Sequence, residues 1–407
     1  MRAVVLCATL AALSLPSVVG AQSVRLTEAD ALARLSPESP RVRALRSDID
    51  VAKADVAAAR RWPNPRLTYD RESVAGVRED MFMVSQALPV TGRRGFAADA
   101  ANALVDATGH RADEALRRAR ADLRLAFAQL VAAQTREQEM TAAAARIRNL
   151  VEILAKREAA GDTAGFDRLR AEREGLELDA DLGAAATERA QAQARLARYF
   201  TDLIDPVQLV AADDSPARSD VPPLESLLER AETVRGDLRA LQKDLDAARF
   251  SLKVADRSRV PEPEVVVGTK SSTLPGADRG GVLTLQASVP LFDRNAPERA
   301  LATARASQAS VRADALRRLV RADVAALRAA VIERRGTAER YRRGALAMTG
   351  ELERIAQISY DAGERGILEL LDAFRTSASA RLRQAALEAA VRDAEIELEF
   401  ASGWEIR

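Results

Sequence analysis

The chain has 407 residues, of which 47% are apolar but only 4% aromatic. Its 61 basic and 60 acidic side chains leave a formal net charge of +1. This balance provides no basic surface for a nucleic acid, and the alanine-rich composition is typical of long, closely packed helices rather than of a compact enzyme core.

The N-terminus has the pattern of a secretory signal over residues 1–21. Arg2 is followed by a short apolar run to Leu15, and small residues end at Ala21, so we expect Gln22 to begin the mature chain. The alternative, an anchor helix, is disfavoured because the run is too short to span a bilayer. Cys7 is the only cysteine, so the mature chain is expected to lack disulfides and thiolate metal sites.

The first half of the mature chain alternates helical and strand patterns. Residues 26–61 are predicted to be one helix, with a capping box at Thr27 and Asp30. A proline-rich segment ends this helix. Residues 66–70 and 81–88 then alternate like strands, with a loop predicted over 74–80, and a hinge follows over 89–95.

A very long helical pattern comes next, over residues 96–160. At about 1.5 Å of rise per residue it would span roughly 100 Å, which is far longer than a globular helix. Two glycines break the pattern at residues 161–165, and a return helix is predicted over 166–200. Residues 201–223, rich in proline and aspartate, are predicted to be a linker with at most one short structured turn.

The same order then repeats. Ala240-Leu241 matches Ala44-Leu45, and a second pair of prolines precedes strand patterns over 265–270 and 282–289. A helical pattern over 300–362, a glycine break at 363–366 and a return helix over 367–400 complete the unit. The chain is therefore predicted to be mainly α with a small β part, as two helix-strand-strand-helix-helix repeats at 22–200 and 224–407.

The strand patterns permit two interpretations. Their length of about nine residues is close to what a tilted transmembrane strand needs. Four strands cannot close a barrel by themselves, so several chains would have to share one. A pair of soluble hairpins is the alternative, and periodicity alone leaves both open. No segment after the signal is long and apolar enough for a transmembrane helix.

The side chains needed for catalysis are scarce. His110 is the only histidine and lies within a long helical pattern, so we expect it to be a solvated or interface residue rather than the base of a Ser/His/Asp set. Gly92 to Gly95 follows a strand but lacks the spacing of a phosphate-binding loop. We therefore predict no enzyme activity, no catalytic residue, no metal ligand and no cofactor.

Four short sequences, in order within the doubled unit, resemble TolC-like outer-membrane efflux proteins, and most closely the heavy-metal branch of the CzcC and CusC type. They are Ser85 to Arg94, Val289 to Asn295, Tyr360 to Ala373, and Phe400 to Gly403. The chain departs from that branch at Ala296-Pro297-Glu298, where glycine and polar residues are usual, and in lacking an N-terminal cysteine for lipidation.

The resemblance implies a homotrimer, in which twelve strands close an outer-membrane β-barrel above a long periplasmic α-barrel. It implies the outer-membrane channel of a tripartite efflux system, conducting metal cations passively from the periplasm to the exterior and so giving heavy-metal resistance. The implied partners are a periplasmic adaptor (membrane fusion protein), a proton-driven inner-membrane pump and outer-membrane lipid. Drug efflux, protein secretion and a periplasmic coiled-coil adaptor or scaffold are the alternatives.

Two sets of residues are the candidate sites. The turns between long and return helices would form the periplasmic tip, where the channel is gated and the adaptor docks, with Asp167 flanking it. Its glycines are expected to adopt positive φ, and its carboxylates either form an acidic ring or cap helices. The tip set is Gly161, Asp162, Gly165, Asp361, Gly363, Glu364 and Gly366. The barrel-to-tunnel hinges are Pro89, Gly92, Arg93, Pro290, Arg294 and Asn295.

Overall fold

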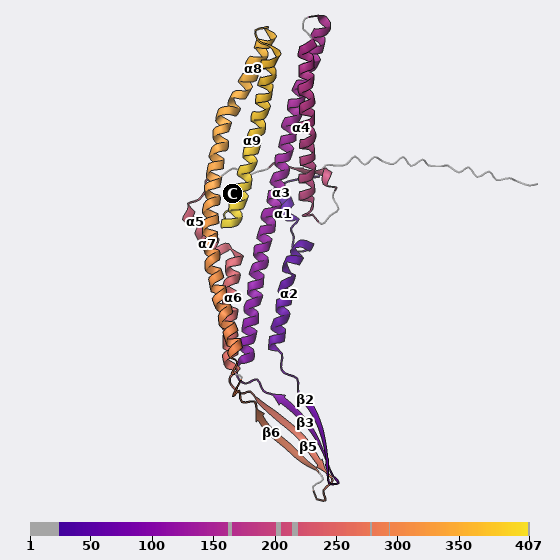
Figure 1. Cartoon of the computed structure of the whole chain (residues 1–407), viewed down its shortest axis with the longest axis vertical. Helices are drawn as coiled ribbons and strands as arrows, with labels where there is room; N and C mark the ends of the chain where they lie inside the picture. Colours follow the sequence, from indigo (N-terminus) through magenta and orange to yellow (C-terminus); the bar gives the residue numbers. More distant parts are fainter. Residues whose placement is uncertain are drawn as a thin grey trace, which may run out of the picture.

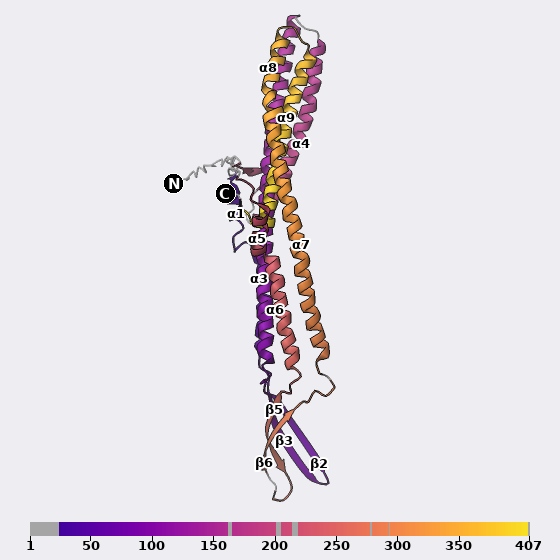
Figure 2. The same cartoon turned by 90° about the vertical axis from the view of Figure 1, so that its left-hand side faces the viewer.

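The computed structural model describes residues 24–161, 165–200, 205–213, 219–276, 279–292 and 294–405. The predicted signal peptide and Asp162 lie outside these ranges. The molecule is a long rod, with a four-stranded sheet at one end and two helical hairpins at the other (Figures 1 and 2). Within the described residues no helix has both the length and the apolar character to cross a membrane.

The first repeat contains α2 (Pro40–Arg60), β2 (Arg66–Val74), β3 (Val77–Ala87), α3 (Arg93–Ala160) and α4 (Gly165–Ala197). The second contains α6 (Gly236–Arg257), β5 (Pro263–Ser272), β6 (Arg279–Ala287), α7 (Ala296–Tyr341), α8 (Ala347–Asp361) and α9 (Ile367–Ser402). Both repeats have the predicted order of elements. The prediction of a mainly α chain with a small β part is confirmed.

Short elements near the middle of the rod pack against its long helices. The strand β1 (Val24–Leu26) pairs in parallel with β4 (Leu209–Ala211), which follows the 3-10 helix η1 (Pro206–Gln208). Together with α1 (Glu28–Ala33) they cover α3, where Leu123, Phe127 and Leu130 are buried. On the other side α5 (Leu224–Val234) packs on α7 and α9. The predicted linker therefore contains structure that is stabilised by tertiary contacts.

The helix α3 is continuous over 68 residues, which corresponds to about 100 Å. It lies at the centre of the protomer and contacts α2, α4, α6 and α9. Many of its buried positions are alanines, whose small side chains allow neighbouring helices to approach closely along the whole rod.

The sheet has the order β2-β3-β5-β6, and every neighbouring pair is antiparallel. The register aligns Leu67 with Val84, Val84 with Val267, and Val267 with Leu283, so apolar residues of all four strands share one face. This apolar face consists of Leu67, Tyr69, Phe82, Val84, Val265, Val267, Leu283 and Leu285. Polar residues are frequent on the opposite face, among them Arg66, Thr68, Ser85, Glu264, Thr284 and Gln286.

Three predicted boundaries were wrong. Residues 26–61 are not one helix, because residues before Pro37 and Pro40 are disfavoured from helical geometry and Ser39 caps α2 instead. The predicted capping box of Thr27 and Asp30 is present on α1.

Residues 74–80 are not a loop. A two-residue turn with positive φ at Ala75 and Gly76 lets Val77 pair with Val74, so both strands are longer than predicted.

The predicted helix over 300–362 starts earlier and is interrupted. A π-helical turn, Arg342–Leu346, separates α7 from α8. Such a turn accommodates one extra residue without ending the helix. Helical periodicity alone does not reveal it, since both flanking segments keep apolar spacing.

Candidate functional site

The turn of the first repeat closes the end of the rod farthest from the sheet. The helix α3 ends at Gly161, whose φ of 83° lies in the left-handed region, and the amide of Gly161 donates to the carbonyls of Arg157 and Glu158. The helix α4 starts at Gly165, where a Cβ atom would lie 2.5 Å from a carboxylate oxygen of Glu158. The flexible side chain of Glu158 can move away from such an atom, so this contact alone does not require glycine, and the expectation of positive φ is wrong there.

The turn of the second repeat has the same division of roles. Gly363 has a φ of 72°, and the amides of Glu364 and Arg365 both donate to the carbonyl of Ser359, at 2.9 and 3.2 Å. Gly366 precedes α9 in an extended conformation with a φ of −84°, so positive φ was wrongly expected there too. The side chain of Glu364 is exposed.

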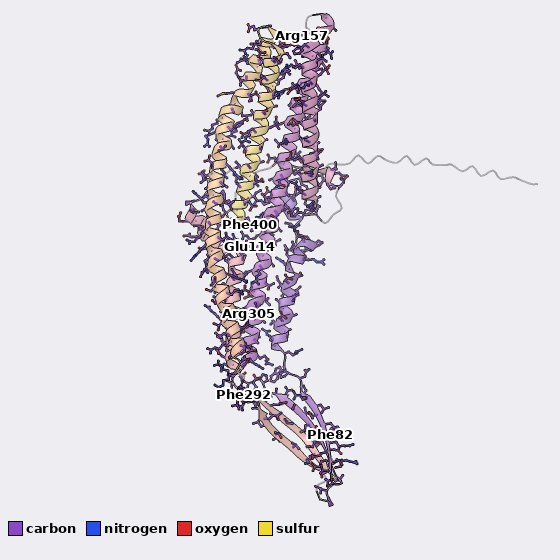
Figure 3. All side chains as sticks on the ribbon, in the orientation of Figure 1. Phe82, Glu114, Arg157, Phe292, Arg305 and Phe400 are labelled. Carbon is purple, nitrogen blue, oxygen red and sulfur yellow. The ribbon has the colours of Figure 1, made fainter. Side chains whose placement is uncertain are left out.

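An ion pair joins the two turns. Nη2 of Arg157, near the end of α3, lies 3.1 Å from Oδ1 of Asp361, at the end of α8. The side chain of Gln357 donates to the other carboxylate oxygen at 3.0 Å. The guanidinium of Arg157 also lies over the ring of Tyr360, 5.5 Å from its centroid. Figure 3 places Arg157 at the extreme end of the rod.

Tyr360 is the buried member of this group. Its ring packs in a core cluster with residues of both repeats, among them Leu154, Ala171 and Leu370. Burial raises the pKa of the Tyr360 hydroxyl, which has no hydrogen-bond partner among the described residues. The structure therefore brings Asp361 into a contact between the repeats, whereas Asp167 lies in the first turn of α4.

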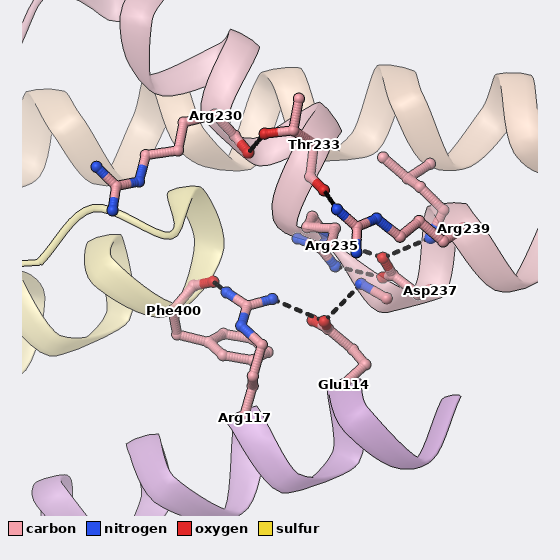
Figure 4. A network of polar contacts seen from close by, with 10 residues as sticks. Glu114, Arg117, Arg230, Thr233, Arg235, Asp237, Arg239 and Phe400 are labelled. Carbon is pink, nitrogen blue, oxygen red and sulfur yellow. Dashed lines mark hydrogen bonds and ion pairs between the residues drawn. The ribbon is translucent and has the colours of Figure 1, made fainter. Parts of the chain in front are cut away.

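A second polar group joins the repeats near the middle of the rod (Figure 4). One carboxylate oxygen of Glu114 on α3 accepts from the amide of Gly236 at 2.9 Å and from Arg117 at 2.7 Å. Arg117 also donates to the carbonyl of Phe400 at 2.7 Å. A Cβ atom on Gly236 would lie 3.1 Å from that of Glu114, so only glycine allows this approach of α6 to α3.

Further ion pairs link α3 to α9 on the tip side of this contact. Arg118 binds both carboxylate oxygens of Glu397, at 2.8 and 2.9 Å, which raises the pKa of the guanidinium. Arg124 pairs with Glu28 and with the nearly buried Glu399. The residue spacing of these charges gives no signal for contacts between segments about 280 residues apart.

The first hinge is held by polar contacts. The chain leaves β3 at Pro89, and Gly92, with a φ of 75°, caps α3. The carboxylate of Glu262 accepts from the hydroxyl of Thr91 at 2.7 Å and from Arg93 at 3.1 Å. The first hinge is therefore fastened to the segment that leads into β5.

The second hinge contacts the end of α6 and the segment that follows it. Asn295, with a φ of 58°, caps α7 and donates to the carbonyl of Ala255 at 3.4 Å. The carbonyl of Arg294 accepts from Arg259 at 3.2 Å. Between these contacts and Pro290 lies Phe292, whose side chain is 100% exposed and projects from the junction of sheet and helices (Figure 3).

His110 and the acidic residues are the side chains of the mature chain that could bind a metal ion. The described residues contain no group of three or more His, Cys, Asp or Glu side chains arranged to hold a metal ion. The carbonyl of His110 faces Gly236, in the packed contact between α3 and α6. What the arrangement offers is a set of contacts between repeats at the tip and at mid-height.

Residues 227–404 match the family model described as outer membrane efflux protein. The match covers most of the second repeat and confirms the resemblance to outer-membrane efflux proteins that the motifs indicated.

Solved structures share the fold over nearly the whole chain. CusC is 17% identical, with 94% of this chain and 93% of CusC covered at a TM-score of 0.78. A membrane protein from Pseudomonas aeruginosa is 20% identical, with 92% and 93% covered at 0.76. The outer-membrane channel OprN is 22% identical, with 92% and 89% covered at 0.74. A comparison with curated proteins gave no match.

Proposed function

We propose that three copies of this efflux protein form a channel through the outer membrane that continues into the periplasm. The apolar face of the sheet carries the proposal. Its side chains are exposed in a single chain, with 79% of Leu283 and 72% of Leu285 accessible. An apolar surface that extends over all four strands needs a cover, and lipid on one side with water on the other fits the two faces.

The dimensions of the sheet support this interpretation. The four strands contain 9, 11, 10 and 9 residues, and a tilted transmembrane strand needs about 9–11. In the described part of the chain β2 and β6 each pair on one side only. Open edges are not tolerated in lipid, so the edges of neighbouring chains would pair and close the barrel.

The edges of the helical part also suit neighbouring copies. On α4, exposed apolar residues follow coiled-coil spacing at Phe166, Leu169 and Leu176. On the opposite edge of the protomer, α8 exposes Met348, Leu352 and Ile355 at comparable spacing. A ring in which α4 of one copy packs on α8 of the next would bury both stripes and close a tunnel.

Substitution of two neighbouring residues on β6 tests the location. Leu283→Lys places a charge on the apolar face, which costs about 2–4 kcal/mol at the centre of a bilayer. We expect this variant to be lost from the outer-membrane fraction. Thr284→Lys is the matched control on the other face, and we expect it to insert normally and to change single-channel conductance. Equal membrane recovery of both variants, or a wild-type protein that stays a water-soluble monomer, would refute the proposal.

We propose that the channel conducts metal cations and that a proton-coupled inner-membrane pump drives their export. This assignment rests on the motifs that resemble the heavy-metal branch. Fold similarity to structures under 25% identical supports the fold alone and does not identify the substrate. Deletion of the gene should lower tolerance to divalent metals more than tolerance to hydrophobic drugs. The opposite order would favour a drug channel.

At the other end we propose that the tip docks a periplasmic adaptor. The turns combine glycines, which permit close approach, with exposed Glu364 and with Asp162 in the same turn region. Replacing both carboxylates with alanine should weaken adaptor binding or change conductance, as measured by adaptor pull-down and planar-bilayer recording. Unchanged values in both assays would show that these carboxylates do not act at the tip.

A further inference from the structure

A pocket of about 420 Å³ lies at the first hinge, where the sheet meets the helices. The end of α2, the start of α3 and one residue of α6 form its walls. It is lined by Ala58, Ala59, Arg61, Trp62, Pro63, Pro89, Arg93, Arg94, Ala97, Val254 and Glu262. Its size is in the range of small-molecule sites.

The charge of the pocket is positive. Arg61, Arg93 and Arg94 line it against the single carboxylate of Glu262. That carboxylate is already engaged, since it accepts from Thr91 and from Arg93. Arg61 forms no ion pair within the described ranges of the chain. Two arginines therefore remain for an anion.

Arg94 is the member whose environment is incomplete. Its guanidinium lies over the ring of Trp62, 4.5 Å from the centroid. Its Nη1 atom is inaccessible to solvent and has no hydrogen-bond partner among the described residues. A buried donor without an acceptor is costly, and a rotation of the guanidinium toward an anionic oxygen in the pocket would satisfy it.

The pocket continues the apolar face of the sheet. Gln86 lies two residues beyond Val84 on the same face of β3, and its side chain donates to the carbonyl of Pro63, which lines the pocket, at 3.0 Å. Trp62 and Val90 at the same junction are 54% and 69% exposed. Tryptophan is typical of the boundary between lipid and water.

We infer that this pocket binds the phosphate headgroup of a membrane phospholipid, with Arg61 and Arg94 as its donors and the acyl chains on the apolar face. The inference rests on the proposed function, because it places the first hinge at the periplasmic boundary of the membrane. Two arginine forks recognise phosphate oxygens, Trp62 contacts the glycerol region, and Ala97 and Val254 provide an apolar wall.

The test uses the full-length trimer in detergent and native mass spectrometry with phosphatidylglycerol as the probe. We expect one tightly held lipid for each protomer. Arg94→Gln should reduce retention roughly tenfold or more, since hydrogen bonds to charged groups are lost. Arg305→Gln removes the same charge from the exposed side of α7, outside the pocket, and should retain lipid like the wild type.

Probes that need no variant keep the inference testable if Arg94→Gln folds poorly. Diacylglycerol, which lacks the phosphate, should bind wild type far more weakly than phosphatidylglycerol. Millimolar inorganic phosphate should not displace the lipid. Equal retention of diacylglycerol, displacement by free phosphate, or unchanged retention in Arg94→Gln would each overturn the inference.

The remaining outcomes separate this inference from the proposed function. A variant and a wild type that both insert and conduct, but retain lipid equally, would refute the lipid site alone. A wild-type protein that forms no membrane-inserted trimer would refute the channel, and the lipid site with it. Dissociation of the trimer in Arg94→Gln but not in Arg305→Gln would show that a second copy of the chain occupies the pocket.

Discussion

The long helices α3 and α7 are equivalent elements of the two repeats, but they occupy different environments. The helix α3 lies between four other helices and buries residues from Ala98 to Leu154. The helix α7 lies at the edge of the protomer and exposes apolar side chains from Leu301 to Ile332. The repeated sequence pattern thus determines the type of element, whereas the position of each helix in the protomer determines which of its residues are buried.

The largest expected effect distinguishes the central helix from the edge. Leu130 on α3 is 0% exposed, so Leu130→Ala should lower the free energy of unfolding by about 2–5 kcal/mol. Leu352→Ala, on the exposed stripe of α8, should cost the separated monomer less than about 1 kcal/mol. Urea denaturation followed by circular dichroism measures both. Similar losses would mean that α3 and the α7–α8 edge are equally buried.

A smaller effect tests whether α7, at the edge of the protomer, also has a buried side. Arg335 on α7 donates to Glu395 of α9 at 2.7 Å, and that carboxylate is almost fully buried. Arg335→Ala removes this partner of the buried Glu395 carboxylate and should lower the free energy of unfolding by about 3 kcal/mol. Arg340 pairs with the exposed Glu333 on the same helix, so Arg340→Ala should change stability by less than about 1 kcal/mol. Thermal unfolding that ranks Arg340→Ala as the more damaging change would contradict this assignment.

The smallest effect depends on pH. Burial raises the pKa of the Asp393 carboxyl on α9. The positive charge of Arg334 lowers this pKa in part, and the negative charge of Glu397 raises it further. The folded state therefore favours the protonated carboxyl, and stability from this group falls as pH rises above the ordinary value of about 3.9. Asp393→Asn should stabilise the protein at neutral pH by on the order of half a kcal/mol. The gain should vanish in acid, and a gain that grows as pH falls would exclude this cause.

Local sequence signals predicted most of the fold. Glycine pairs located both tip turns, and apolar alternation located all four strands, because these signals act within a few residues. The extent of the strands and the break at Arg342–Leu346 were not predictable. The first depends on pairing across the turn at Ala75 and Gly76, and the second on an extra residue that helical periodicity tolerates.

The candidate sites were predicted only in part. The tip glycines and the hinge residues could be named, since backbone geometry restricts those positions. Their partners could not. Arg157 meets Asp361 across 204 residues of sequence, and Glu262 meets Arg93 across 169. Such pairs depend on how the two repeats lie side by side, which no local pattern contains.

The contact between Gly236 and Glu114 also makes the two repeats different at their helix starts. The equivalent start of α2 is Pro40, which lacks an amide hydrogen and carries a ring. At the position of Gly236, proline would lose the hydrogen bond to Glu114 and would collide with α3. A gene in which the α2 segment replaced the α6 segment would therefore encode a clash at mid-height, so the two repeats are not interchangeable at this position.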